Sequence, residues 1–203
     1  MSELQPPLVT VITVSFNHAD YVAESLRSVI AQDYEAIEYV VIDDGSTDSS
    51  AQIIESFRDI CARRFRHFVF VQQLNAGSVA TLNRALSLAR GEYLFFLASD
   101  DVAESHAISR LVDVLKSDPN TSLVAPDNSL IDATGRPCSW TSDRRATYES
   151  KSAAYSSFAD YLRKTTAPYD FDGDWFGSYE ALIPGNHVPN GTLVRRSAIE
   201  KVG

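Results

Sequence analysis

Hydrophobic residues along the first 126 positions alternate between two spacings. Short, nearly continuous apolar runs are typical of buried strands, and they occur at residues 8–15, 37–42, 68–71, 93–97 and 122–125. Between them, apolar residues three or four apart predict helices at residues 21–31, 49–61, 79–89 and 108–115. Gly91 is expected to end the third helix at its C′ position. The alternation predicts an α/β fold, a doubly wound, mostly parallel sheet with helices on both faces.

The pattern changes after residue 126. Residues 140–190 are rich in Ser, Tyr, Asp and Gly; a turn is expected at residues 132–135 and one helical patch at residues 153–162. A strand is expected again at residues 191–194, and a helix begins at residues 197–202. We therefore expect two regions, an α/β region at residues 1–126 and a loop-rich region at residues 127–203. Loops of this kind often carry specificity because they lie over strand ends.

Polar residues gather directly after three of the predicted strands, at residues 15–17 (SFN), 43–48 (DDGSTD) and 98–101 (ASDD). In open α/β sheets, ligands bind at this carboxyl edge. Adjacent carboxylates such as Asp100 and Asp101 repel each other, and a divalent cation that neutralises them is one explanation of the pair. The other is that Asp101 caps the following helix, with Glu104 three residues later. Taken alone, the pair favours neither explanation.

Composition and charge exclude one class of partner. The 203 residues are 44% hydrophobic and 22% charged, as is usual in globular proteins. With 27 acidic residues against 18 Lys and Arg, the formal net charge is −9, which disfavours nucleic acid because phosphate backbones are bound by clustered cations. A diphosphate stays compatible where a metal ion bridges the like charges. No apolar run approaches the roughly 20 residues that span a bilayer, so we expect no transmembrane segment in this chain and a cytoplasmic location.

Cysteine and histidine positions predict no metal site. Cys61 and Cys138 are far apart, and reduced thiols are expected in a cytoplasmic protein. None of the four histidines has a partner at ligand spacing, so we assign no role to His18, His67, His106 or His187.

Four motifs follow one another in a fixed order. They are residues 14–17 (VSFN), residues 31–34 (AQDY), residues 41–48 (VIDDGSTD) and the stretch from Asn75-Ala76-Gly77 through Gly91 to Asp101. Each motif alone is weak, but the ordered set resembles the family 2 glycosyltransferases, which are inverting enzymes of the GT-A fold. The resemblance covers residues 8–126 and resumes at residues 191–203.

The resemblance implies a function. A member of this family transfers a sugar from a metal-bound nucleoside-diphosphate sugar, here favoured to be a UDP-sugar, to a hydroxyl acceptor with inversion. Mn²⁺ or Mg²⁺ is the implied cofactor, and a saccharide or lipid-linked saccharide is the implied acceptor, as in polysaccharide biosynthesis. Residues 1–126 would be the nucleotide-sugar donor-binding part and residues 127–203 the acceptor side. Any association with a membrane surface would come from regions outside this chain.

The resemblance also implies roles for individual residues. Phe16 stacks near the nucleobase, and Asp44 accepts a hydrogen bond from a uracil-like imide. Asp100 and Asp101 hold the metal and the ribose; because Ala98 stands where the family often has another Asp, which of the two binds the metal stays open. The other implied nucleotide-binding residues are Ser15, Asn17, Asn75, Gly77 and Asn83, with Arg84 beside Asn83.

Two further pairs in the motifs are expected to be structural. Asp43 and Ser46 hold the turn after the second strand, since Asp and Ser bond their own backbone in such loops. Arg195 and Arg196 flank the last strand, from which one of them could reach a phosphate.

The catalytic base is not among these residues. In the family it lies in an acidic motif downstream of residues 195–203, so it is expected beyond Gly203; Asp170, Asp172 and Asp174 do not match that motif. We therefore expect the donor-binding part of a larger enzyme. The alternative is a noncatalytic nucleotide-sugar-binding or interaction module on the same fold.

Overall fold

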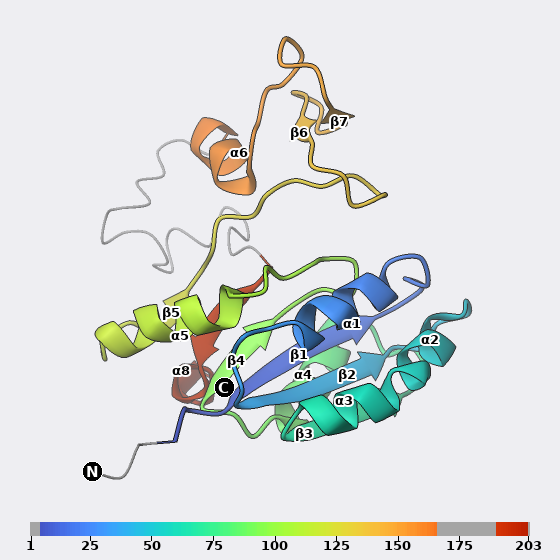
Figure 1. Ribbon diagram of the computed structural model, residues 1–203, viewed down its shortest axis with the longest axis vertical. Coiled ribbons are helices and arrows are strands. Elements are labelled where there is room, and N and C mark those ends of the chain that lie inside the picture. The colour runs from blue at the N-terminus through green and yellow to red at the C-terminus, as the bar shows by residue number, and fades with distance from the viewer. Residues whose placement is uncertain (1–4, 166–189, 203) are drawn as a thin grey trace. The chain divides into compact units, whose positions relative to one another are not determined.

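A computed structural model describes residues 5–165 and 190–202 of the chain (Figure 1). These residues fall into two compact units. The first holds the described residues up to Ala125 and those from Asn190 onward, and the second begins at Pro126. The two units are described separately below.

The first unit is built on a six-stranded sheet with the strand order β3-β2-β1-β4-β8-β5. Four strands are parallel: β1 (Val9–Ser15), β2 (Ile37–Asp43), β3 (His67–Gln72) and β4 (Tyr93–Phe96). β8 (Thr192–Arg195) lies antiparallel between β4 and β5 (Leu123–Val124). This confirms the predicted α/β class and the mostly parallel sheet.

Helices cover both faces of this sheet, as predicted. One hydrophobic cluster joins the strands to α1 (Val22–Ile30), α2 (Ser50–Ser56), α3 (Arg58–Arg64) and α5 (Ala107–Ser117). A second cluster, on the other face, joins them to α4 (Ser78–Leu88) and α8 (Arg196–Val202). Alternate residues of β1 and β2 enter the two clusters, so the strands are buried on both sides, which explains their continuous apolar runs.

Two details of the helices differ from the prediction. The helix expected at residues 49–61 is divided at Phe57, whose amide donates to the carbonyl of Ile54 in a tight 3₁₀-type turn. Gly91 does not end α4 in a left-handed conformation, because the helix cap is Ala89. Glycine is required there because a Cβ on Gly91 would lie 2.5 Å from the backbone nitrogen of Thr10. The expected C′ role is therefore wrong, and close packing takes its place.

The division of the chain also differs from the sequence expectation. The second unit begins at Pro126, near the expected change of character. Residues 192–202, however, form β8 and α8, and hydrogen bonds between β8 and β4 join them to the sheet of the first unit. Sequence alone could not assign them, because a strand pattern does not name its partner.

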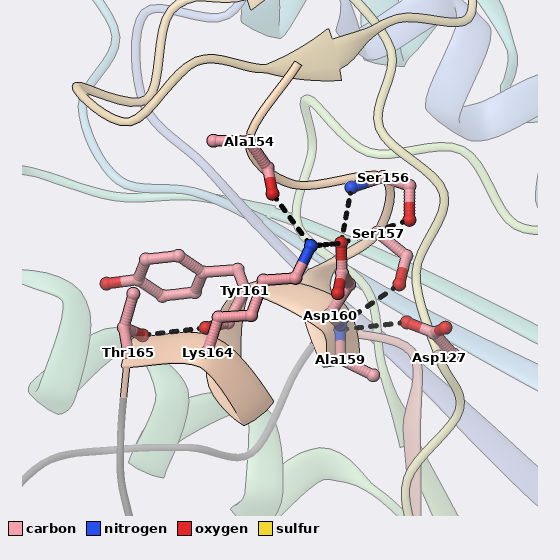
Figure 2. Close-up of polar contacts among 9 residues, drawn as sticks. All are labelled: Asp127, Ala154, Ser156, Ser157, Ala159, Asp160, Tyr161, Lys164 and Thr165. Carbon is pink, nitrogen blue, oxygen red and sulfur yellow. Dashed lines mark hydrogen bonds and ion pairs between the residues drawn. The ribbon is translucent and has the colours of Figure 1, made fainter. Parts of the chain in front are cut away.

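The described part of the second unit contains a two-stranded antiparallel sheet, β6 (Ser139–Trp140) and β7 (Ala146–Thr147), and one helix, α6 (Phe158–Thr165). Figure 2 shows how α6 begins. The Asp160 amide donates to Ser157 Oγ, the Ala159 amide donates to Asp127, and Asp160 pairs with Lys164 one turn on. These bonds satisfy the first amides of the helix, which is why it starts at residue 158 and not at 153.

Cys61 and Cys138 both lie in the described part of the chain. Both cysteines are free there, as expected from their spacing. Among residues 5–165 and 190–202, no helix is both long enough and apolar enough to cross a membrane.

Candidate functional site

The carboxyl ends of β1, β2 and β4 lie at one edge of the sheet. The parallel register pairs Ser15 with Asp43, and β4 runs alongside β1 with Ile12 opposite Phe96. The loops that follow these strands therefore begin side by side, as the sequence predicts. They are the β1–α1 loop, the β2–α2 loop and the segment of residues 98–108, which we call the acid segment.

Carboxylates of the β2–α2 loop are bound by the loops themselves. Asp43, fully buried, accepts hydrogen bonds from the amide of Ser46 (3.1 Å) and from its hydroxyl. Asp48 accepts from the amides of Ala19 (3.0 Å) and Ser50 (2.9 Å). The turn-holding role expected for Asp43 and Ser46 is confirmed.

Asp44 organises the neighbouring β3–α4 loop. Its carboxylate accepts hydrogen bonds from the amides of Ala76 (2.9 Å) and Gly77 (3.0 Å) and from the side chain of Gln73 (2.7 Å). Burial raises the pKa of Asp44, but these hydrogen bonds outweigh it and bring the pKa below its usual range. A carboxylate has about four acceptor positions, and the hydroxyl of Thr81 is a fourth donor to this one, so the protein itself fills them and leaves the residue only 3% exposed. Its contact with a nucleobase stays a prediction.

Residues at the end of β1 lie in different environments. Ser15 is fully buried, and within the described chain its Oγ has no hydrogen-bond partner, so the side chain lies inside the fold and not at its surface. Phe16 is 44% exposed, as stacking on a ligand requires and core packing does not. Asn17 adopts a positive φ of 55° and joins the β1–α1 and β2–α2 loops: its side chain accepts from the Thr47 amide (2.8 Å), and its own amide donates to Ser46 Oγ (2.9 Å).

Of the nucleotide-binding residues predicted after β3, Asn75 and Gly77 lie in the β3–α4 loop, and Asn83 and Arg84 lie in α4. The backbone of Asn75 packs on Gly45, where a Cβ would lie 2.6 Å from the Asn75 nitrogen. Gly77 has a positive φ of 84° with open space around it. Asn83 is exposed on α4, and Arg84 beside it donates to Gln73 (2.6 Å), which in turn binds Asp44. Gln73 thereby links Arg84 to Asp44 of the β2–α2 loop.

The acid pair does not cap a helix. α5 begins at Ala107 with His106 as its N-cap residue, so the cap explanation of Asp101 is wrong. Asp100 is 47% exposed at its side chain, and Asp101 is partly buried beside it. Burial, and next the charge of Asp100, raise the pKa of Asp101, while a hydrogen bond with Asn190 and the charge of His18 lower it in part. Burial and the neighbouring charge together disfavour the ionised form of Asp101.

His18 belongs to this site, although sequence analysis gave it no role. Its Nδ1 lies 2.7 Å from Ser99 Oγ and 3.8 Å from Asp100 Oδ1. The His18 amide donates to Ser50 Oγ (2.9 Å), which fixes the backbone of the loop. A signal was present in the sequence, since His18 directly follows Phe16 and Asn17 at a strand end that was already a candidate. The remaining histidine and acid candidates of the loop-rich region, His187, Asp170, Asp172 and Asp174, lie outside the described residues.

Arg195 and Arg196 lie at the opposite edge of the sheet. Arg195 pairs with Tyr93, the first residue of β4, and its guanidinium donates to the carbonyls of Thr121 (2.7 Å) and Leu115. Arg196 donates to the carbonyl of Ala89 (2.9 Å). Both arginines flank the last strand, as expected, and because they hold main-chain carbonyls at the amino edge, neither reaches a phosphate at the carboxyl edge.

Comparison with known proteins decides the family. A model of the family described as Glycosyl transferase family 2 matches residues 10–182, most of the chain. The chain belongs to glycosyl transferase family 2. This confirms the resemblance inferred from the four ordered motifs.

The chain is similar to several named family 2 glycosyltransferases. It is 33% identical over 132 residues to the putative teichuronic acid biosynthesis glycosyltransferase TuaG of Bacillus subtilis, a match that covers 62% of this chain and 51% of TuaG. The mannosyltransferase PcManGT from Pyrobaculum calidifontis, solved with GDP-Man and Mn²⁺, is 27% identical with a TM-score of 0.56, covering 60% of this chain and 36% of that one. The chain spans about half or less of the length of these relatives.

Structures of TarS from S. aureus, residues 1–349, support the GT-A fold of this family 2 glycosyltransferase. The unliganded form covers 96% of this chain and 49% of TarS, with a TM-score of 0.62 at 21% identity, which bears on the fold alone. The complex with UDP-GlcNAc is 27% identical with a TM-score of 0.55, over 66% of this chain and 38% of TarS.

The donor set at the edge of this family 2 glycosyltransferase fits a hard divalent cation. Among the described residues, no three His, Cys, Asp or Glu side chains are arranged to hold a metal ion on their own. Mg²⁺ and similar ions, however, are commonly held by one or two carboxylates together with phosphates and water. Asp100 and Asp101 supply two such carboxylates, and a cation would stabilise the charged form of Asp101, whose pKa is raised first by burial and then by the charge of Asp100.

Proposed function

We propose that this chain binds the donor of a glycosyl transfer, a nucleoside-diphosphate sugar held with Mn²⁺ or Mg²⁺ at the carboxyl edge of the sheet. The observation that carries the proposal is the acid pair: Asp100 and Asp101 are like-charged neighbours at the ligand-binding edge that cap no helix. Their place in the fourth motif of glycosyl transferase family 2 supports the same conclusion.

In this proposal Asp100 and Asp101 hold the cation and the ribose, and His18 orients Asp100 from the neighbouring loop. The chemistry that such a cation supplies is neutralisation of the charge that develops on the departing diphosphate. Exposed Phe16 stacks on the base. Backbone and side-chain groups near Asp44, including Asn17, Asn75, Gly77 and Asn83, border the nucleotide. The buried Ser15 side chain supports this border from inside the fold.

We favour UDP as the nucleotide because the family resemblance places Asp44 beside the imide N–H of a uracil-like base. Similar proteins hold different nucleotides, since TarS was solved with UDP-GlcNAc and PcManGT with GDP-Man. A direct comparison of nucleotides is therefore the informative experiment.

The transfer itself is proposed to proceed with inversion. An acceptor hydroxyl attacks the anomeric carbon opposite the departing diphosphate, and a carboxylate base removes its proton. That base stays unassigned. By the resemblance, the loop-rich second region receives a saccharide or lipid-linked saccharide acceptor. The name of TuaG supports a place in polysaccharide biosynthesis. A cytoplasmic location is part of the same proposal.

Thermal unfolding with nucleotide tests the proposal. With Mn²⁺ and UDP at about 100 times the dissociation constant, the free energy of unfolding should rise by about 2.7 kcal/mol, which is about 5–11 °C for a chain of this size. GDP and dTDP should raise the melting temperature less than UDP. The matched control is UDP with EDTA. If no nucleotide with Mn²⁺ raises the melting temperature, the donor-site proposal is wrong.

A further inference from the structure

Helix α1 carries a row of polar side chains on a buried face. Ser25, Ser28 and Gln32 are three and four residues apart, so they lie along one side of the helix and its C-terminal turn. Their exposed fractions are 0%, 8% and 4%. Polar groups buried in a helix interface are expected to have specific partners, because an unpaired one destabilises the fold.

The partners outside the helix are all in the acid segment; within the helix, Ser28 Oγ also donates to the carbonyl of Ser25 (2.7 Å). Ser25 Oγ donates to the carbonyl of Ala98 (3.2 Å), and Ser28 Oγ accepts from the amide of Ala103 (3.1 Å). The side-chain amide of Gln32 makes two bonds to this segment: Nε2 donates to the carbonyl of Glu104 (2.7 Å), and Oε1 accepts from the amide of Ile108 (3.1 Å). Nε2 also donates to the carbonyl of Ser28 within the helix (3.1 Å). The acid pair lies between these attachment points, which are on both sides of it in sequence.

The other end of α1 follows the loop that carries Phe16 and His18. That loop meets the acid segment at the His18–Ser99 contact of 2.7 Å. Helix α1 therefore spans the two parts of the candidate site, the loop with the exposed aromatic ring and the segment with the two carboxylates. A change in how the acid segment is attached to α1 changes where the carboxylates lie relative to Phe16.

We propose that Gln32 is a positioning residue of the donor site, which sets the location of Asp100 and Asp101 through its two hydrogen bonds to the acid segment. This inference rests on the proposed function. In this proposal Gln32 touches neither the cation nor the nucleotide. Its substitution should therefore change only the gain in nucleotide affinity that the metal ion provides. Residues that orient metal ligands from outside the coordination shell commonly change metal affinity 10- to 100-fold.

The test compares Gln32→Met with Arg64→Met. Methionine keeps the length and apolar volume of Gln32 but removes its two hydrogen bonds to the acid segment, together with the one to the Ser28 carbonyl. Arg64 is the matched control, because its guanidinium donates to the carbonyls of Ile30, Gln32 and Tyr34 at the same end of α1, and none of its described bonds reaches the acid segment. The dissociation constant of UDP is measured by calorimetry with Mn²⁺ and again with EDTA, and the ratio of the two is compared among variants.

We expect Gln32→Met to reduce the Mn²⁺-dependent gain in UDP affinity about 10- to 100-fold and to leave the affinity in EDTA unchanged. Arg64→Met should keep the wild-type ratio even where its melting temperature falls as far. Should Gln32→Met fail to fold, Ser28→Ala removes the bond to Ala103 and should lower the same ratio by a smaller factor.

Two outcomes separate this inference from the function beneath it. A wild-type chain whose UDP affinity gains from Mn²⁺, together with a Gln32→Met variant of unchanged ratio, would overturn the positioning role alone. A wild-type chain that gains nothing from Mn²⁺ would overturn the proposed function and the positioning role with it. Equal losses in Gln32→Met and Arg64→Met would also contradict the inference, since a general loosening of α1 would then explain both.

Discussion

The two acidic loops at the carboxyl edge of the sheet have similar composition and different surroundings. In the β2–α2 loop, Asp43, Asp44 and Asp48 accept hydrogen bonds from amides and side chains nearby. In the acid segment, Asp100 is half exposed, and Asp101 lies beside it with a raised pKa, caused first by burial and then by the charge of Asp100. Acidic residues at a strand end are therefore not equivalent. The donors supplied by the protein decide which carboxylates hold the fold together and which are available to a ligand.

The largest expected effect is the loss of ligand binding when the carboxylates of the acid segment are removed. Replacing the acid pair with the isosteric amides, Asp100→Asn and Asp101→Asn together, should weaken Mn²⁺-dependent UDP binding by more than about 100-fold, the upper end of what a residue outside the coordination shell costs. Calorimetry with and without EDTA measures it. Without ligand, the double variant should melt at the same temperature as the wild type or higher, because it removes the partly buried charge of Asp101, whose pKa is raised first by burial and then by the charge of Asp100. A clear fall in that temperature would mean that the pair is structural.

Two glycines test how tightly the β2–α2 loop is built. Gly45→Ala places a Cβ 2.6 Å from the Asn75 nitrogen at a φ of +79° and should destabilise the chain by about 2–4 kcal/mol. Gly77→Ala, the matched control, has a φ of +84° and a ψ of 155° but open space, and should cost about 1–3 kcal/mol from backbone strain alone. Urea unfolding measures both. Equal losses would contradict the packing of Asn75 on Gly45.

Asp44→Asn tests whether that carboxylate is structural. The amide replaces one acceptor oxygen by a donor, so the amide of Ala76 or Gly77 loses its partner in a buried place. Leaving one buried donor unpaired costs about 1–3 kcal/mol, measurable as a lower urea midpoint. Asp100→Asn is the control at the same edge and should change the midpoint little. If the Asp44 variant is as stable as the wild type, the β3–α4 loop is held by something else.

The smallest expected effect concerns how stability depends on pH, measured in EDTA: the contribution of Asp101 and the contributions of Asp44 and Asp48 should have opposite signs. Asp101 has a raised pKa, so its cost to stability is present at neutral pH and disappears as pH falls through that pKa toward the unfolded value of about 3.9. Asp44 and Asp48 have lowered pKa values, so their contribution is present above about 3.9 and is lost as pH falls below it.

As the pH is lowered from neutrality to about 4, the melting temperature should therefore rise slightly, and below about pH 4 it should fall. The control is the Asp101→Asn variant, in which the gain above pH 4 should shrink while the fall below pH 4 stays. An unchanged gain in that variant would contradict the assignment to Asp101.

Local patterns in the sequence were sufficient for the sheet and most of its helices, and for placing Asp100 and Asp101 at a strand end. Periodicity and turn chemistry act over a few residues, and so does the bond between Asp43 and Ser46 that the sequence predicted correctly. The family resemblance added the expectation of a donor site.

What the sequence could not supply depends on contacts between distant residues. Asp44 meets Ala76 and Gly77 more than thirty residues away, and His18 meets Ser99 across a separation of 81 residues. The local sequence pattern predicted that Gly91 ends a helix. The structure shows instead that glycine is needed at this position because the backbone of Thr10 lies too close for a Cβ. That Arg195 and Arg196 hold main-chain carbonyls at the amino edge could not be foreseen, because the direction of β8 in the sheet is not written in its own residues.

The position of β8 has a consequence for how such proteins change over evolution. β5 and β8 are hydrogen-bonded neighbours, with Val124 opposite Leu193, so the chain between them leaves and re-enters the sheet at one place. An insert with adjoining ends can be lengthened or exchanged cheaply, since each doubling of a flexible loop adds only about 0.6 kcal/mol of closure entropy. Recombination could therefore replace that whole insert as a cassette, and a two-residue hairpin in its place would give a minimal single-sheet domain for engineering.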